Sequence, residues 1–257
     1  MLPIGVLDFL DLKWQSTGGV SVGCDDPAVP TDEQNLAWRA AQAFLTAVDS
    51  SMGLHIRISK GIPVAAGLGG GSADAAAVLL ALNHMLEDRL QMSDLKTMAR
   101  TLGADVPFFL YQKPALARGI GDDLVQVDGL PDFPVVLIKP PLAVSTRWVY
   151  ESLKLTRKRS RIKLPTFVAR PWQLREVMEN DLESVTLKSY PVLGEIKAWL
   201  IQNGALGALM SGSGPTVFGV FQERRHADQV GVLAERRWPD CWAIATQVFG
   251  NAAVKIE

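Results

Sequence analysis

The chain has 257 residues, of which 48% are hydrophobic and 21% are charged. This composition excludes the disordered and fibrous classes and is sufficient for one large or two modest globular domains. The 26 Lys and Arg residues and the 27 Asp and Glu residues leave a formal net charge of -1. Because this charge is close to zero, no overall attraction to nucleic acid or to an anionic membrane is expected, and neither is predicted as a partner.

The two cysteines, Cys24 and Cys241, lie in neither a CxxC pair nor a Cys/His cluster with metal-ligand spacing. This usage favours a reducing compartment, so we expect a cytoplasmic protein. The longest uninterrupted apolar stretch, residues 75–82, is much shorter than the roughly 20 residues that span a bilayer. The first residues lack a basic leader and a small-residue cleavage site, and no signal peptide is predicted. The three histidines are scattered through unrelated segments, so no metal site is predicted.

The first half of the chain alternates predicted strands with predicted helices. Thr31 and Asp32 are the side chains expected to cap the first helix, which runs through residues 36–48. A second helix is expected over residues 72–85 and a third over residues 93–101. Strands are predicted over residues 6–14, 20–22, 54–58 and 108–111, and a turn between strands is predicted over residues 119–123.

Glycine dominates the segment before the second predicted helix. Four glycines occur among residues 67–71, and an alanine-rich run follows Ser72. Glycine in a helix interior costs about 1 kcal/mol relative to alanine. We therefore expect residues 67–71 to form a loop, and Ser72 to cap the helix behind it.

The second half of the chain begins near residues 130–134, a proline-rich segment that is the best candidate for a domain boundary. The basic residues 157–163 are expected to form an exposed polar connection. Residues 207–216 are expected to form another glycine-rich loop. Strands are predicted over residues 135–138, 217–221 and 242–248, and helices over residues 172–179, 192–202 and 227–236.

A glycine loop that leads into a helix N-terminus is physically suited to bind anions. Missing Cβ atoms let backbone N–H groups approach phosphate oxygens, and the helix dipole adds positive potential. A polyphosphate is the expected ligand. The spacing differs from the P-loop pattern GxxxxGK[ST], and residues 67–72 match the dinucleotide fingerprint only as GxGxxS. Since no acidic residue follows at the position that binds a ribose, a dehydrogenase is disfavoured.

The residues around this loop resemble those of the GHMP kinases. Residues 63–72 fit the family signature Pro-x-x-x-Gly-Leu-Gly-Ser-Ser in a triple-glycine form, GLGGGS. Residues 102–109, LGADVPFF, and residues 211–216, SGSGPT, match further motifs of the family. Together these motifs are similar to those of the branch that phosphorylates a cytidine diphosphate-linked methylerythritol in non-mevalonate isoprenoid biosynthesis.

The resemblance implies a two-domain α+β fold, with an N-terminal nucleotide-binding α/β domain over residues 1–132 and a C-terminal ferredoxin-like α+β domain over residues 133–257. It implies transfer of the ATP γ-phosphoryl group, with Mg²⁺ as the companion of ATP, to the 2-hydroxyl of that small-molecule substrate. Asp105 would contact the substrate as the catalytic aspartate that orients or deprotonates this hydroxyl. The implied ATP-binding residues are Asn35, Lys60, Pro63, Gly67, Leu68, Gly69, Gly70, Gly71 and Ser72. The other implied substrate-binding residues are Tyr150, Ser213 and Thr216.

Several of these residues are also typical of ordinary structural roles. An asparagine at a helix start, such as Asn35, is usually a cap, and a lysine at a strand end, such as Lys60, is usually solvated. Tyr150 fits core packing as well as stacking on a cytosine. For Ser213 and Thr216 we favour support of the glycine loop over contact with substrate.

The family pattern also contains an upstream strand with an Ala-Lys-x-Asn-like sequence and a Gly-Tyr-His hairpin. No lysine precedes Lys13, and Lys13 does not lie in that motif. We expect a truncated start, and the alternative is a natural short form with lost or changed activity.

Two other functions stay open at this point. One is a different GHMP kinase, such as a homoserine or mevalonate-type kinase. The other is a nucleotide-binding module without catalysis, because the lysine of the upstream motif is absent. The expected partner in each case is a small molecule, and the protein is expected to be a monomer or a weak homodimer.

Overall fold

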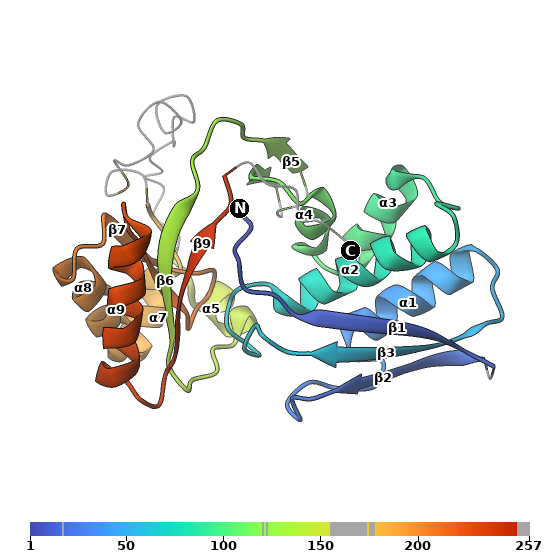
Figure 1. Cartoon of the computed structure of the whole chain (residues 1–257), viewed down its shortest axis with the longest axis horizontal. Coiled ribbons are helices and arrows are strands. Elements are labelled where there is room, and N and C mark those ends of the chain that lie inside the picture. Colours follow the sequence, from blue (N-terminus) through green and yellow to red (C-terminus); the bar gives the residue numbers. More distant parts are fainter. Residues whose placement is uncertain (17, 120, 122, 155–173, 175–177, 251–257) are drawn as a thin grey trace.

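A computed structural model describes residues 1–154, except for residues 17, 120 and 122, together with residues 174 and 178–250. The described chain forms two halves that lie side by side, each built from a sheet and the helices packed on it (Figure 1). The predicted basic connection at residues 157–163 and most of the helix predicted at residues 172–179 lie outside the described residues.

The first half contains a three-stranded mixed sheet in the order β1-β3-β2. β1 (Phe9–Gln15) is antiparallel to β3 (Gly53–Ser59), and β2 (Gly19–Cys24) is parallel to β3. α1 (Leu36–Ala47) makes the crossover between the two parallel strands, and it packs with α2 (Gly70–Met85) on one face of the sheet. The strands predicted from alternating residues are confirmed, with somewhat different ends.

The cap of α1 differs from the prediction. Asn35, and not Thr31 or Asp32, is the N-cap residue, because its Oδ1 accepts a 2.8 Å hydrogen bond from the N–H of Ala37. Its Nδ2 donates to the carbonyl oxygen of Pro30 at 2.7 Å, which fixes the chain that enters the helix. Asp32 forms a turn just before the helix, where its Oδ1 accepts from the N–H of Gln34.

The start of α2 also differs from the prediction. Gly69 is the N-cap residue, with φ at 75° in the left-handed region, and Gly70, Gly71 and Ser72 form the first helical turn. Ser72 is therefore not the cap. The first turn of a helix tolerates glycine because the buried alanine-rich run behind it provides the packing that holds the helix in place.

The apolar segment predicted as a strand over residues 108–111 is helical. α4 (Val106–Tyr111) follows α3 (Met92–Leu102) and buries Val106 and Leu110 in the same core as α2. A short apolar run does not distinguish a buried strand from a buried helix. Pro107, in the first turn of α4, is the residue that favours a helix start here.

The second half contains a four-stranded antiparallel sheet in the order β7-β8-β6-β9. β7 (Gly207–Met210) was predicted as part of a loop, but it pairs with β8, so the loop itself is confined to residues 211–216. The strand predicted over residues 242–248 coincides with β9. The hairpin of β4 (Ala115–Arg118) and β5 (Asp123–Gln126) precedes this half in the chain and forms a separate two-stranded sheet. The other elements of this half are the strands β6 (Phe133–Lys139), β8 (Val217–Val220) and β9 (Trp242–Val248), and the helices α5 (Thr146–Ser152), α7 (Glu183–Ser189), α8 (Pro191–Gln202) and α9 (Arg224–Arg237).

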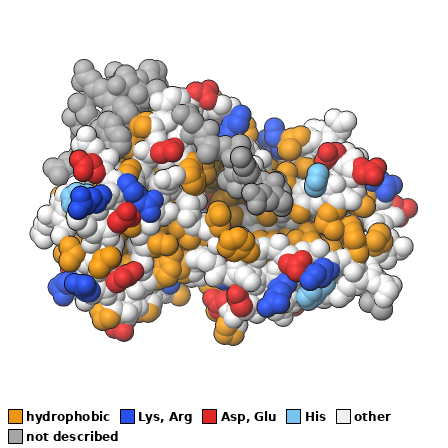
Figure 2. Space-filling view, in the orientation of Figure 1, with side chains coloured by type: hydrophobic (Ala, Val, Ile, Leu, Met, Phe, Trp, Pro, Cys, Tyr) orange, Lys and Arg blue, Asp and Glu red, His pale blue; other side chains and the backbone are white. Residues whose placement is uncertain are grey.

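β6 divides its side chains between two cores because alternate residues point to opposite faces of a sheet. Val136 and Ile138 pack with α8 and α9, whereas Val135 and Leu137 pack on the other face. Val6 and Ile62 of the first half belong to that second core, so this face joins the halves. Figure 2 shows hydrophobic side chains along the middle of one face of the molecule, where the halves meet.

The N-terminal segment runs from one half to the other before β1 begins. Ile4 forms an isolated bridge with Val248 of β9, and the N–H of Gly5 donates to the carbonyl oxygen of Gln247 at 2.9 Å. The domain boundary between residues 132 and 133 stays a prediction. Within the described residues, no helix combines the length and the apolar character needed to cross a membrane.

Candidate functional site

Three backbone amides at the start of α2 lack partners within the helix. The first helical hydrogen bond runs from the N–H of Ala73 to the carbonyl oxygen of Gly69 at 2.9 Å, so the amides of Gly70, Gly71 and Ser72 precede it. Gly71 is exposed and Gly70 and Ser72 are half-buried. These amides and the positive end of the helix dipole form a cradle for an anion.

Gly67 allows two loops from different halves of the chain to interlock. Its φ is 73°, and a Cβ at this position would lie 2.6 Å from the carbonyl oxygen of Ser211 and 2.7 Å from that of Gly214. The Ser211 hydroxyl donates to the carbonyl oxygen of Gly67 at 2.8 Å, and the N–H of Thr216 donates to that of Ala66 at 3.3 Å. The loop at residues 211–216 therefore packs against the glycine loop and holds it in place through these hydrogen bonds.

The loop at residues 211–216 is itself held by polar side chains of the second half. The hydroxyls of Ser213 and Thr146 lie 2.8 Å apart, and the hydroxyl of Thr186 donates to the carbonyl oxygen of Ser213 at 3.2 Å. Asn180 donates from Nδ2 to the carbonyl oxygens of Met210 and Gly212, each at 2.8 Å. Ser213 is buried, so its place in the structure agrees with support of the glycine loop.

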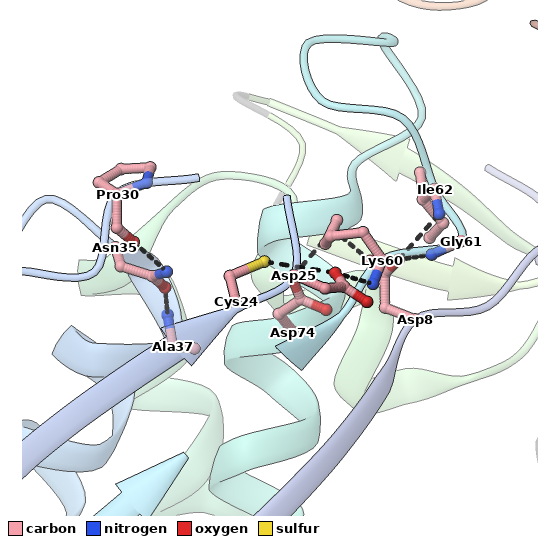
Figure 3. A network of polar contacts seen from close by, with 10 residues as sticks. All are labelled: Asp8, Cys24, Asp25, Pro30, Asn35, Ala37, Lys60, Gly61, Ile62 and Asp74. Atoms are coloured by element: carbon pink, nitrogen blue, oxygen red, sulfur yellow. Dashed lines mark hydrogen bonds and ion pairs between the residues drawn. The ribbon is translucent and has the colours of Figure 1, made fainter. Parts of the chain in front are cut away.

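Lys60 lies between two carboxylates instead of extending into solvent (Figure 3). Its Nζ forms one ion pair with Asp8 Oδ2 and another with Asp74 Oδ2, the latter at 3.2 Å. Asp8 Oδ1 also accepts hydrogen bonds from the N–H groups of Gly61 and Ile62, both at 2.8 Å. The Asp8–Lys60–Asp74 cluster thus connects the segment before β1, the segment after β3 and the first turns of α2.

The two carboxylates of the cluster are not equivalent partners of Lys60. Desolvation opposes the charge of Lys60, but the hydrogen bond that Lys60 donates to Asp8 and the charge of Asp74 outweigh it, so the Lys60 pKa is raised. Burial, as the largest effect, raises the Asp74 pKa to about 7 in spite of the charge of Lys60. Asp8 and Lys60 form an ion pair, and burial makes Asp74 the group that gains or loses a proton near neutral pH.

This raised pKa predicts an effect on stability. Between its ordinary value of 3.8 and about 7, Asp74 holds a proton in the folded state that the unfolded state has lost, so its contribution to stability falls as the pH rises through this window. We would measure the free energy of unfolding of wild type and Asp74→Asn by urea denaturation. As the pH rises from about 4 to about 7, the value for Asp74→Asn minus the value for wild type should increase. A difference that is independent of pH would contradict this assignment.

Asp105 occupies the N-cap position of α4, but its side chain makes no capping hydrogen bond. The residue is accessible to solvent, yet enough protein surrounds the carboxyl that desolvation raises its pKa. Phe109, one helical turn further along, contacts the glycine loop: a Cβ at Gly69 would lie 2.8 Å from its Cζ. With a rise of 1.5 Å per residue, Asp105 is about 6 Å along the helix axis from Phe109. Asp105 thus lies one helical turn from the residue of α4 that contacts the glycine loop.

Known proteins are similar to this chain over most of its length. Residues 35–113 match the family described as GHMP kinases N terminal domain, and residues 171–236 match GHMP kinases C terminal. The protein named 4-diphosphocytidyl-2-C-methyl-D-erythritol kinase in Geobacter sulfurreducens is 45% identical over 93% of this chain and 86% of its own length. The chain belongs to the GHMP kinase family. The protein of the same name in Geobacter metallireducens is 48% identical over 88% of this chain and 81% of its own length.

This GHMP kinase has the same fold as solved structures of other kinases. A crystal structure of 4-(cytidine 5'-diphospho)-2C-methyl-D-erythritol kinase has a TM-score of 0.80 and 35% identity, and the match covers 97% of this chain and 89% of that one. Homoserine kinase from Cytophaga hutchinsonii has a TM-score of 0.78 at 21% identity, a likeness that shows the fold alone. The two-domain α+β fold expected from the sequence motifs is confirmed.

The other residues predicted for the kinase site are spread around the cradle. Leu36 follows Asn35, and its Cδ1 atom lies 3.9 Å from the point where a Cβ of residue 71 would stand. The start of α1 therefore flanks the start of α2. Leu68 packs with the core that joins the halves, and Pro63 is half-buried. Tyr150 lies on α5 with 61% of its surface exposed, so it is not a core residue.

Thr216 is fully buried, and its Oγ1 has no hydrogen-bond partner among the described residues. Its backbone contact with Ala66 favours a supporting role in the kinase fold. Contact of either hydroxyl with a substrate stays a prediction.

Sequence motifs did not predict the Asp8–Lys60–Asp74 cluster. Asp74 alone gave a usable signal, because a single acidic residue within a run of alanines is unusual for a buried helix face. Asp8 gave none, because its partners are distant in sequence. Among the described residues, no group of three or more His, Cys, Asp or Glu side chains is arranged to hold a metal ion.

Proposed function

We propose that this GHMP kinase transfers the γ-phosphoryl group of ATP to the 2-hydroxyl of 4-diphosphocytidyl-2-C-methyl-D-erythritol, a step of non-mevalonate isoprenoid biosynthesis. The observation that carries the proposal is the glycine cradle, together with Asp105 at the start of the helix whose Phe109 contacts the glycine loop. The named relatives, at 45% and 48% identity, support this choice of substrate.

Each part of the site has a separate task in this reaction. The amides of Gly70, Gly71 and Ser72 bind phosphate oxygens and stabilise the charge that develops during transfer. Asp105 orients the acceptor hydroxyl and accepts its proton. The hydroxyl oxygen forms a bond to the γ-phosphorus while the bond from that phosphorus to the bridging oxygen breaks, and ADP leaves.

The raised pKa of Asp105 suits a general base, because a carboxylate with a higher proton affinity accepts a proton more readily. It also sets a lower pH limit for the reaction. Asp105 must be ionised to act, so the rate falls as the pH drops through its folded-state pKa.

Mg²⁺ is proposed as the companion of ATP. Such ions commonly bind through substrate phosphates and only one or two protein groups. The hydroxyl of Ser72, in the first turn of α2, is the oxygen that this chain offers beside the cradle. When bound, the ion would neutralise charge on the phosphates.

Substrate recognition is proposed to involve Tyr150. Its exposed ring on α5 is available to stack on a cytosine, and stacking on an aromatic side chain contributes about 1–3 kcal/mol per base. Asn35 and Lys60, which flank the cradle, are proposed to border the nucleotide. We also propose that the protein acts in the cytoplasm as a monomer or a weak homodimer.

A substrate panel tests this function. We expect ADP release with ATP, Mg²⁺ and 4-diphosphocytidyl-2-C-methyl-D-erythritol, and none above background with homoserine or mevalonate. Turnover of one of these other alcohols would assign the chain to a different kinase of the family. ATP binding by calorimetry without turnover of any substrate would instead indicate a nucleotide-binding module.

A further inference from the structure

The Asp8–Lys60–Asp74 cluster lies directly against the anion cradle. The exposed fraction of the side chain is 8% for Lys60, 2% for Asp8 and 6% for Asp74. The Nζ atom of Lys60 lies 3.3 Å from the point where a Cβ of residue 70 would stand. The charge of the cluster is therefore placed under the first turn of α2, whose amides form the cradle.

Asp74 is the least satisfied member of the cluster. Its Oδ2 contacts Lys60, but its Oδ1 is buried and has no hydrogen-bond partner among the described residues. An ionised carboxylate in this position leaves a charged oxygen without compensation, which is unfavourable. Burial therefore raises the Asp74 pKa to about 7, and both charge states are accessible near neutral pH.

The charge state of Asp74 determines the charge of the whole cluster. With Asp74 neutral, Asp8 and Lys60 compensate each other, and with Asp74 ionised the cluster carries one excess negative charge. The other titratable groups drawn in this network are Cys24, the last residue of β2, and Asp25, which follows it. Asp25 accepts from the backbone N–H of Lys60 at 2.9 Å and is exposed to solvent, so its charge is well screened.

We propose that Asp74, acting through Lys60, is a positioning residue whose charge sets how tightly the glycine cradle holds a triphosphate. A neutral Asp74 leaves Lys60 free of a second carboxylate and favours the bound anion. An ionised Asp74 draws the ammonium away from the cradle and repels the anion across the first turn of α2. This inference rests on the proposed function, because it takes the cradle to be a nucleotide site.

Nucleotide affinity as a function of pH tests the proposal. We would measure the Kd of ATP by calorimetry at about pH 6 and about pH 8 for wild type, Asp74→Asn and the control Asp11→Asn. Asp11 is an exposed residue of β1, paired with Lys13 on the surface. The ratio of the Kd of each variant to that of wild type at one pH cancels the ionisation of ATP itself.

We expect wild type to lose about three- to tenfold in affinity relative to Asp74→Asn between the two pH values, as one partly screened charge predicts. Asp11→Asn should follow wild type at both. If Asp74→Asn also follows wild type, the proposal is wrong. If wild type binds ATP at neither pH, the proposed function itself is wrong. The failure of this proposal can therefore be distinguished from the failure of the proposed function.

A second measurement needs no variant and stays informative if Asp74→Asn fails to fold. Reciprocity requires that a ligand favoured by the neutral carboxyl must in turn favour the proton. In a carbon-13 titration of wild type, saturating ATP should raise the pKa of the Asp74 carboxyl. A purely structural carboxyl would titrate identically with and without ATP, and that result would also overturn the proposal.

Discussion

Replacing Asp105 by asparagine is expected to lower kcat by about 10² to 10⁴-fold, the usual contribution of a general base. The affinity for ATP should change by no more than about twofold, because the cradle amides belong to α2 and not to α4. The loss should therefore appear in kcat and not in the KM for ATP, as for an interaction that is made mainly in the transition state. Initial rates at saturating ATP and methylerythritol substrate measure it.

The pH profile adds a second readout for the same variant. Wild type should lose activity as the pH falls through the raised pKa of Asp105, and Asp105→Asn should lack this acid limb. Asp240→Asn, at an exposed residue in the other half, is the matched control and should behave as wild type. Undiminished turnover of Asp105→Asn would remove Asp105 from the chemistry.

Gly67→Ala is expected to disrupt the cradle. The new Cβ would stand 2.6 Å and 2.7 Å from two carbonyl oxygens of the loop at residues 211–216, and the residue would keep a φ of 73°. The left-handed conformation alone costs roughly 1–2 kcal/mol for a residue other than glycine, and the clash adds to this. We expect a loss of about 2–4 kcal/mol in the free energy of unfolding and at least about a tenfold weaker affinity for ATP.

Gly194→Ala provides the matched control for this variant. Gly194 lies within α8, and a Cβ there would have no heavy atom within 4 Å. Alanine should stabilise the helix by up to about 1 kcal/mol and leave ATP affinity unchanged. Urea denaturation and calorimetry of both variants decide the matter: a Gly67→Ala protein as stable as Gly194→Ala would contradict the interlocked loops.

The parts of the fold that could be predicted from sequence are those with a clear local period. β3 alternates buried and exposed residues, and β9 was predicted with its observed ends. The apolar run of α4 has no period that separates helix from strand, so its packing on α2 decides its structure. β7 is a strand because β8 pairs with it, and four residues carry too weak a signal alone.

The candidate site shows the same division between local and distant information. The glycine loop is a local signal, since residues adjacent in sequence build the cradle. Its support is not local: Ser211 contacts Gly67 from 144 residues away, and Lys60 contacts Asp8 from 52 residues away. No pattern within a window of sequence can pair such residues. The resemblance to the GHMP kinases predicted that Ser213 and Thr216 support the glycine loop, but the Ser211–Gly67 and Lys60–Asp8 contacts were visible only in three dimensions.

Phosphorus NMR of one reaction mixture tests the central claim most directly. The chain is mixed with ATP, Mg²⁺ and 4-diphosphocytidyl-2-C-methyl-D-erythritol, and the phosphorus resonances are followed with time. The proposed kinase reaction predicts equimolar ADP and a new phosphomonoester resonance. Because carbon 2 of the methylerythritol carries a methyl group and no proton, the position of the new phosphate is established through its coupling to carbon-13. Persistence of both starting compounds, or ADP formed together with free inorganic phosphate, would contradict it.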